Sequence, residues 1–241
     1  MDLGIAGKVA LVTASSKGLG RASAEALAGD GAKVVICGRG EETLRVTEAG
    51  IRSAGGEVHG VVADVTDPAA PDSLVAETIR HYGALDILVA NAGGPPPGRA
   101  LDVTDDQIAV AVNANLTTSV RLVRAALPSM RSAGWGRICC ITSWSVKQPM
   151  RELALSNLAR TGLWAWAKTA AHDLFDSGVT LNLACPGPHA TDRMLQLGGS
   201  DATMGDPGDF GRLVAFLCSA HAGYISGTAV MVDGAASVGL L

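Results

Sequence analysis

A glycine-bearing turn near the N-terminus has the residue types and spacing that bind phosphate. Residues 13–20 read TASSKGLG, and they lie between a short apolar run and an alanine-rich segment with helical spacing. Glycine lets the backbone approach a phosphate closely, and a helix that starts there offers free N–H groups and the positive end of its dipole. This strand–turn–helix context favours nucleotide binding over an ordinary turn.

The residues expected beside the ribose of a bound dinucleotide are basic rather than acidic. Folds of this type that prefer NAD place a carboxylate at the end of the second strand, where it binds the ribose 2′-hydroxyl. Here that strand ends in ICGR, so Arg39 stands near the expected place, and Lys17 lies in the turn itself. Two cations would attract a 2′-phosphate. The sequence therefore predicts NADP(H), the alternative being that both are solvated surface charges.

Short β-branched runs alternate with longer helical segments, and this alternation would position the turn. Compact apolar runs are typical of parallel strands buried on both faces, and repeated βαβ units give a doubly wound sheet. We expect one domain over residues 1–241, a Rossmann-type α/β fold with a seven-stranded, mostly parallel sheet flanked by helices. The expected strands are Lys8–Thr13, Lys33–Gly38, Glu57–Ala63, Asp86–Asn91, Arg137–Thr142, Val179–Ala184 and Thr228–Val232.

Two irregular segments are expected at the carboxyl edge of this sheet, where open α/β sheets bind ligands. Residues 93–98 read GGPPPG directly after an expected strand, which predicts a stiff surface loop rather than a linker between domains. Residues 186–207 are rich in Gly, Asp and Thr, which predicts a mobile lid over a pocket.

These motifs together resemble the short-chain dehydrogenase/reductase (SDR) family, of the 3-oxoacyl-acyl-carrier-protein reductase-like type, almost from end to end. Residues 13–20 resemble the family's Thr-Gly-x-x-x-Gly-x-Gly loop, although Ala14 stands where the family usually has glycine. A methyl group there would narrow the turn and weaken cofactor binding modestly. Three further motifs resemble family segments that contact adenine, follow the fourth strand, or lie beside the nicotinamide: Asp64-Val65, Asn91-Ala92-Gly93, and Pro186-Gly187 with Thr191.

The resemblance implies a set of cofactor-binding residues spread over several strand ends. They are Thr13, Ser15, Ser16, Lys17, Gly18, Leu19, Arg39, Asp64, Val65, Asn91, Ala92, Gly93, Arg160, Pro186, Gly187, His189 and Thr191. The resemblance also implies a homotetramer, or a dimer, and a small-molecule carbonyl substrate whose identity the sequence leaves open.

The catalytic tetrad of the family, Asn-Ser-Tyr-Lys, is only half matched. Asn115 and Ser143 fall at the positions of the family's asparagine and serine. Where the family has Tyr-x-x-x-Lys, this chain has Ser156 and Arg160, and no other Tyr-x-x-x-Lys occurs in the sequence. The i, i+4 spacing would still place the two side chains on one helix face.

This replacement changes the chemistry that the site can perform. A serine hydroxyl is a much weaker acid than a phenol, and arginine stays protonated and cannot relay a proton through its own deprotonation. Such a pair can hold a nicotinamide ribose and place positive charge near an oxyanion. It is poorly suited to proton transfer near neutral pH.

Three functions remain open from the sequence. The first is an NADPH-dependent oxidoreductase of the ketoreductase type, in which water or another side chain, with Lys147 and His189 as candidates, supplies the proton. The second is a nucleotide-binding SDR-like protein with little or no turnover, such as a sensor or an oligomer subunit. The third is non-redox chemistry like that of halohydrin dehalogenases. Those relatives keep the tyrosine and lose the glycine loop, the reverse of this chain.

Composition excludes several other classes of protein. The 241 residues are 48% hydrophobic with a formal net charge of −4 and no basic stripe, which argues against nucleic acid as a partner. We expect no membrane span and no signal peptide. Five scattered cysteines form no disulfide framework, which favours the cytoplasm. We expect no metal site, because the five histidines show no ligand spacing: His59, His81, His172, His189 and His221.

Overall fold

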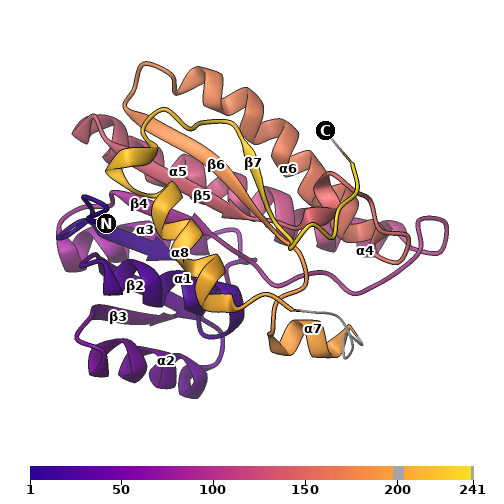
Figure 1. Cartoon of the computed structure of the whole chain (residues 1–241), viewed down its shortest axis with the longest axis horizontal. Coiled ribbons are helices and arrows are strands. Elements are labelled where there is room, and N and C mark those ends of the chain that lie inside the picture. The colour runs from indigo at the N-terminus through magenta and orange to yellow at the C-terminus, as the bar shows by residue number, and fades with distance from the viewer. Residues whose placement is uncertain (198–203, 240–241) are drawn as a thin grey trace.

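Seven parallel strands form one sheet at the centre of the computed structural model, which describes residues 1–197 and 204–239 (Figure 1). The strand order is β3-β2-β1-β4-β5-β6-β7. The strands are β1 (Val9–Val12), β2 (Lys33–Gly38), β3 (Glu57–Val62), β4 (Ile87–Ala90), β5 (Gly136–Ile141), β6 (Val179–Pro186) and β7 (Ala229–Val232). The predicted Rossmann-type architecture is confirmed, and the strand ends differ from the prediction by at most two residues.

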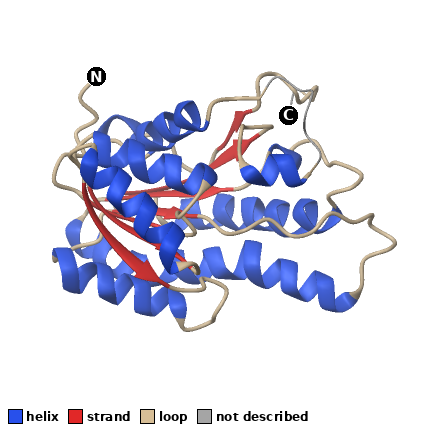
Figure 2. Cartoon of the chain, turned by 90° about the horizontal axis from the view of Figure 1, so that it is seen from below, coloured by secondary structure: helices blue, strands red, loops and turns tan. Residues whose placement is uncertain are grey.

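Helices cover both faces of the sheet, as Figure 2 shows. On one face, α1 and α8 pack side by side over a core that includes Leu27 and Phe210. On the other face, the core includes Leu74 of α3, Leu122 of α5 and Leu163 of α6. The helices are α1 (Gly18–Gly29), α2 (Glu41–Ser53), α3 (Ala70–Tyr82), α4 (Asp105–Val112), α5 (Thr118–Ala133), α6 (Ala154–Asp173), α7 (Asp192–Gln196) and α8 (Pro207–Leu217).

Strand β3 departs from the expectation that every strand is buried on both faces. Glu57 and Val62 at its ends are exposed, and His59 and Gly60 are half-buried. The reason is topological, because β3 pairs only with β2 and forms one edge of the sheet. An edge strand has a neighbour on one side only, so polar side chains are tolerated there.

The order of the strands reverses between β1 and β4, which are adjacent in the sheet. At such a switch point the following segments leave toward opposite faces and open a crevice at the carboxyl ends of the strands. The glycine turn after β1 and residues 93–98 after β4 both start there. The fold therefore brings together segments that are nearly 80 residues apart in the sequence.

A short π-helical turn, Asn113–Thr117, joins α4 to α5. Helix α4 begins with a capping box, in which the Thr104 hydroxyl accepts from the Gln107 amide and Gln107 accepts from the amide of Thr104. A π turn widens the helix locally and often occurs at functional sites. In the described residues, no helix is both long and apolar enough to cross a bilayer.

Candidate active site

The glycine turn presents an uncapped helix N-terminus to the crevice. Lys17 is the N-cap of α1, its side chain makes no capping hydrogen bond, and the first turn of α1 contains no acidic residue. The amides of this turn are therefore free to bind an anion. Ala14 and Gly18 both have left-handed backbone conformations, with φ of 46° and 57°. The alanine adopts the conformation that glycine adopts most easily.

Hydrogen bonds across the switch point hold this turn against the end of β4. The Thr13 hydroxyl donates to the carbonyl of Asn91 at 2.7 Å and accepts from the Asn91 amide at 2.8 Å. The Asn91 side chain donates through Nδ2 to the carbonyl of Ala14 at 3.0 Å. A Cβ at Gly20 would lie 2.6 Å from that same carbonyl oxygen, so the start of α1 approaches the turn as closely as glycine allows.

The Ser15 side chain forms hydrogen bonds that stabilise the turn, and it does not face the crevice. It is fully buried, and its hydroxyl donates to the Val12 carbonyl at 2.6 Å and accepts from the Cys37 amide at 3.1 Å. Its neighbour Ser16 is half-buried, and its carbonyl accepts from the Thr47 hydroxyl at 2.9 Å. These bonds tie the turn to β2 and α2, so both serines help to set its shape.

Two cations lie at the open end of the turn. Arg39 is 82% exposed and its Nη1 lies 4.0 Å from Oδ2 of Asp64. Lys17 is 62% exposed and its Nζ lies 3.7 Å from Oδ2 of Asp192. Ion pairs this long and exposed hold their partners weakly, so both cations remain able to bind another anion.

Asp64 is fixed near the start of the loop that follows β3. Its Oδ1 accepts from the Thr66 amide at 3.0 Å and the Thr66 hydroxyl at 2.8 Å, and these bonds lower the pKa of the carboxyl. Val65 between them is buried in the core. The carboxylate thus stays charged and keeps a defined position near Arg39.

The second half of the crevice contains Asn115, Ser143, Ser156 and Arg160. Asn115 is buried in the π turn, where its Nδ2 donates to the Ala111 carbonyl at 3.4 Å. Ser143 follows β5 directly, and its Oγ accepts from the Ser145 amide at 3.2 Å. Ser156 and Arg160 lie one turn apart on the buried face of α6.

Arg160 reaches across to the carboxyl end of β5. Its Nη1 donates to the carbonyl of Ile141 at 3.2 Å and also to the carbonyl of Thr142. Its Nε is buried and has no hydrogen-bond partner among the described residues. The pKa of this guanidinium is lowered to about 10, mainly by burial and in smaller part by repulsion from Arg193. The group is therefore a buried cation at neutral pH.

The first residues of the predicted lid contact the turn and the proline-rich loop. Thr191 caps α7, and a Cβ at Gly18 would lie 3.7 Å from the Thr191 methyl group. Arg193 donates through Nη2 to the Pro95 carbonyl at 2.5 Å. Arg193 was not among the site residues predicted from the sequence, although a cation in an expected lid, near a loop whose backbone carbonyls can accept from it, could have indicated it. Residues 198–203 of the predicted lid lie outside the described residues.

His189 and the end of β6 form the wall behind α7. The imidazole is buried, its Nδ1 lies 3.0 Å from the Gly187 carbonyl, and its ring packs edge-on against Phe210 at 5.4 Å. The Gly187 amide donates to the Val232 carbonyl at 2.9 Å, which continues the pairing of β6 with β7 beyond Pro186. His189 therefore packs against α8.

The remaining predicted residues lie at the rim of the crevice or in its wall. Ala92 is half-buried and Gly93 is exposed, directly after Asn91. Leu19 lies in the first turn of α1 and packs against the core. The predicted residues thus lie at the carboxyl ends of the strands or on the elements that follow them, with Ser15 and His189 turned into the surrounding protein.

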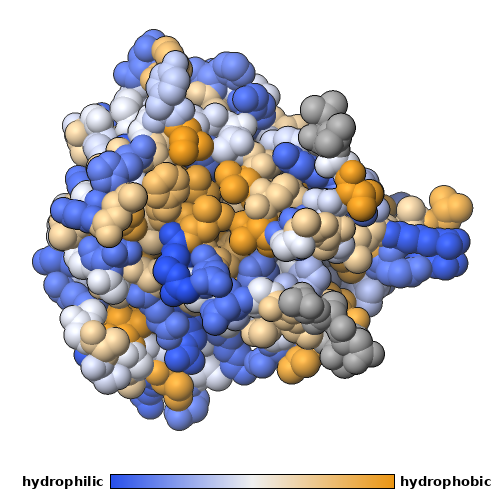
Figure 3. All heavy atoms as spheres, viewed as in Figure 1, coloured by the Kyte–Doolittle hydropathy of each residue, from blue (hydrophilic) through white to orange (hydrophobic). Residues whose placement is uncertain are grey.

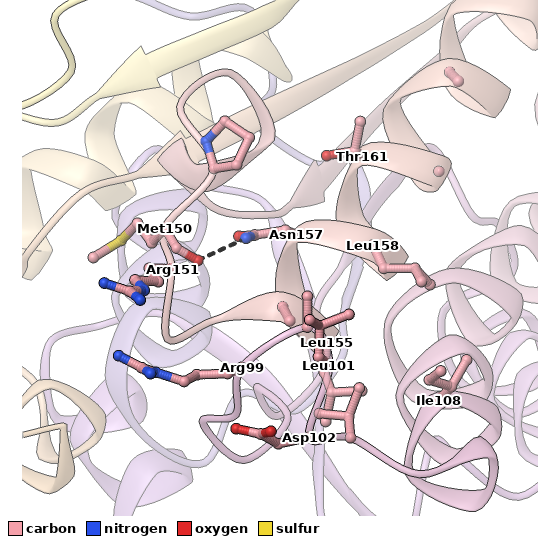
Figure 4. Close-up of a pocket in the computed structure, with 16 residues that line it drawn as sticks. Arg99, Leu101, Asp102, Ile108, Met150, Arg151, Leu155, Asn157, Leu158 and Thr161 are labelled. Atoms are coloured by element: carbon pink, nitrogen blue, oxygen red, sulfur yellow. Dashed lines mark hydrogen bonds between the residues drawn. The ribbon is translucent and has the colours of Figure 1, made fainter.

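A groove lies on the other side of α6 (Figure 4). It has a volume of about 910 Å³ and is lined by Leu158, Gly162 and Ala165, which share the helix face opposite Ser156 and Arg160. Its lining contains none of the residues predicted for the active site. We therefore distinguish this groove, called the α6 groove below, from the crevice.

The fold defines an α/β protein of the doubly wound class, and comparisons with known proteins narrow the class to a family. The family model described as "Enoyl-(Acyl carrier protein) reductase" matches residues 13–237. Dehydrogenase/reductase SDR family member 4 of Homo sapiens is 32% identical over 243 residues, which covers 95% of this chain and 87% of the relative. The chain belongs to the short-chain dehydrogenase/reductase family.

Solved structures of reductases are similar over nearly the whole chain. An actinorhodin polyketide ketoreductase with NADPH has a TM-score of 0.89 at 30% identity, covering 94% of this chain and 96% of that one. L-Sorbose reductase from Gluconobacter frateurii, complexed with NADPH and L-sorbose, has a TM-score of 0.91 at 29% identity, covering 97% and 98%. These neighbours are oxidoreductases, and both were solved with the same nicotinamide cofactor.

Proposed function

We propose that this chain is an NADPH-dependent reductase that transfers hydride to the carbonyl of a small molecule and takes its proton from a group other than tyrosine. The observation that carries the proposal is the buried cation Arg160, held on the carbonyls at the end of β5 beside Ser143. A buried positive charge beside two serine hydroxyls stabilises negative charge that develops on an oxygen.

The residues at the switch point fit NADPH. The uncapped start of α1 would offer amides to a pyrophosphate, and the exposed cations Lys17 and Arg39 would bind a ribose 2′-phosphate. The similar ketoreductase and sorbose reductase were both solved with NADPH. When bound, NADPH supplies the hydride, and the residues of this chain orient and polarise the acceptor.

Ser143 and Ser156 would donate hydrogen bonds to the carbonyl oxygen of the substrate, and Arg160 would stabilise the charge that forms there. None of the three is suited to give up a proton near neutral pH. His189 packs against Phe210 with Nδ1 at the Gly187 carbonyl, which leaves Lys147 or water as the source. The Lys147 ammonium lies 5.8 Å from the centre of the Trp164 ring, and Trp164 lies further along α6 than Ser156. We propose water as the proton donor, with Lys147 as the alternative source.

A second candidate function is cofactor binding with little or no turnover. The observation that favours it is the absence of a tyrosine at position 156, because the remaining groups bind and polarise without transferring a proton. NADPH titration does not separate the two functions, since both need the same turn.

A panel of ketones, cyclic ketones and acyl thioesters separates them, with NADPH oxidation followed by absorbance. We expect the wild type to oxidise NADPH with at least one class and the Arg160→Met variant to lose about 100-fold or more in kcat, because one electrostatic donor is removed. Tight NADPH binding with no oxidation above background by any carbonyl would reject the reductase. The Ser156→Tyr, Arg160→Lys double variant is tested on the same panel. A large gain in its rate of NADPH oxidation would show that the natural pocket lacks only an acid.

We further propose that the chain forms a homotetramer in the cytoplasm. Two apolar faces support this: the α6 groove, and the face around α8 and the outer strand β7, where apolar residues gather in Figure 3. A closed tetramer of identical chains with dihedral symmetry needs two different self-complementary faces. On the second face the partly buried apolar residues are Leu213, Phe216, Ile225, Val230 and Val232. All five cysteines are buried and unpaired, as a reducing compartment favours.

A further inference from the structure

Three metal-ligating side chains meet at the β3 edge of the sheet, outside the candidate active site. His59 lies on β3, and Glu77 and His81 lie one turn apart on α3. The ligand atoms of the three residues all lie within 4.8 Å of one another. The sequence contained only half of this signal, because the i, i+4 spacing of Glu77 and His81 is visible but the approach of His59 depends on the fold.

We propose that His59, Glu77 and His81 bind a divalent transition metal ion of the Zn²⁺ type, which clamps the edge strand β3 to α3. Two imidazoles and one carboxylate are the ligands that such ions prefer, with the remaining positions open to water. Mg²⁺ and Ca²⁺ prefer oxygen ligands, so two histidines select against them. This proposal revises the expectation, drawn from sequence spacing, that the chain has no metal site.

Two of the three ligands are already placed for a metal. Nε2 of His59 lies 3.1 Å from Oε1 of Glu77, and both side chains are only about one-quarter exposed, at 26% and 25%. Tetrahedral ligands about 2.1 Å from a zinc ion lie about 3.4 Å apart, so this pair needs little movement. The present distance between the histidine and carboxylate atoms is therefore close to the separation of two ligand atoms on one zinc ion.

His81 must turn to complete the site. Its ring stacks on that of His59 with centroids 4.0 Å apart and planes 7° from parallel. A metal ion lies in the plane of each imidazole that binds it, so two parallel stacked rings cannot both face one ion. His81 is exposed, so its side-chain torsions can rotate the ring toward Glu77 without disturbing the core.

Arg80 competes for the carboxylate. It donates from Nε to Oε2 of Glu77 at 2.8 Å and from Nη2 to Oε1 at 2.5 Å. A metal ion must displace at least one of these bonds, and the guanidinium also repels it. Removal of the Arg80 charge should therefore strengthen metal binding. If the cluster has only a structural role, no metal should bind with or without this charge.

The test uses the full chain without an affinity tag, treated with a chelator and then titrated with ZnCl₂ by calorimetry. We expect one site per chain, and His81→Ala and Glu77→Gln should weaken binding about tenfold or more. Arg80→Gln should tighten binding severalfold. His172→Ala is the matched control, because His172 is exposed in the last turn of α6 and should leave the affinity unchanged. CoCl₂ should give the visible absorption of a low-coordinate site in the wild type, Arg80→Gln and His172→Ala, but not in His81→Ala.

Thermal unfolding provides an independent measurement, because a ligand that binds only the folded chain raises its melting temperature. We expect ZnCl₂ to raise the Tm of the wild type and of Arg80→Gln but not of His81→Ala. Absence of stoichiometric binding would overturn the proposal. So would binding that His59→Ala and His81→Ala both leave unchanged, since the ion would then be held elsewhere.

Discussion

At the scale of single residues, Arg160 differs from an ordinary buried cation in how its charge is stabilised. Its hydrogen bonds go to the backbone carbonyls of Ile141 and Thr142, and no carboxylate pairs with it in residues 1–197 and 204–239. Carbonyl dipoles stabilise a cation without cancelling its charge. The charge therefore remains available to an anion or an oxyanion in the crevice.

The pH dependence of turnover tests this role. Burial lowers the pKa of Arg160 from its ordinary value to about 10, so the cation is fully present below that pH and is lost as the pH rises through it. We expect kcat/KM for carbonyl reduction to be flat between about pH 6 and 9 and to fall as the pH approaches 10. The check is a pH profile of initial rates. A descending limb near neutral pH would instead indicate a titrating proton donor and would contradict this role of Arg160.

Arg39 is predicted to select the phosphorylated cofactor. Loss of its charge in Arg39→Ala should weaken NADPH binding about tenfold, because one charge-assisted contact is removed, and should leave NADH binding unchanged. Binding is measured by titration of cofactor fluorescence. Arg45→Ala is the matched control, because Arg45 is an exposed arginine on α2 that pairs with Glu41. Equal weakening of NADH and NADPH would contradict a contact with the 2′-phosphate.

At the scale of elements, the bond between Thr13 and Asn91 joins the end of β1 to the end of β4. We expect Thr13→Val to cost about 1–3 kcal/mol of unfolding free energy, because it leaves the partly buried amide and carbonyl of Asn91 without the hydroxyl. It should also weaken NADPH binding by loosening the turn. Denaturant unfolding measures the first effect.

The control for that change is Thr169→Val. Thr169 is exposed on α6 and its hydroxyl bonds only to the Ala165 carbonyl. We expect Thr169→Val to change the free energy of unfolding by less than about 0.5 kcal/mol. A loss at Thr13 no larger than at Thr169 would mean that the two strand ends are held by other contacts.

The elements that the sequence predicts well are those with local causes. Apolar β-branched runs predicted all seven strands, and the glycine spacing predicted the turn and the start of α1. The π turn around Asn115 could not be predicted, because one extra residue in a helix leaves the apolar spacing of α4 and α5 unchanged. The exposure of β3 was missed because its apolar composition does not reveal which strand lies at an edge.

Contacts between segments that are distant in the sequence could also not be predicted. The hydrogen bond from the Cys37 amide to the Ser15 hydroxyl depends on the parallel pairing of β1 with β2, which brings the two residues together. The approach of His59 to His81 depends on α3 crossing the outer strand. The family resemblance could name Ser156 and Arg160, but only the fold places the guanidinium on the carbonyls after β5.

At the scale of the whole molecule, the crevice and the α6 groove occupy opposite faces of one helix. Assembly through the groove would therefore stiffen the helix that carries Ser156 and Arg160. The groove is lined largely by apolar side chains, and Leu158 among them is 48% exposed.

Leu158→Asp is predicted to reduce the proposed homotetramer to a smaller species, because a charge buried in an apolar interface is strongly destabilising. Light scattering coupled to size exclusion gives the mass directly. The control is Phe175→Asp, since Phe175 is 76% exposed beyond the end of α6 and outside the groove. A tetramer that tolerates Leu158→Asp would show that the groove is not a subunit contact.

The central claim is that Arg160 supplies the positive charge for carbonyl reduction by NADPH, and single-turnover kinetics tests it most directly. NADPH-loaded wild type and Arg160→Met are mixed with the best carbonyl substrate, and the loss of reduced cofactor is followed in time. We predict that the variant still binds NADPH but transfers hydride about 100-fold more slowly or worse. Equal rates of hydride transfer in the two proteins would contradict the account.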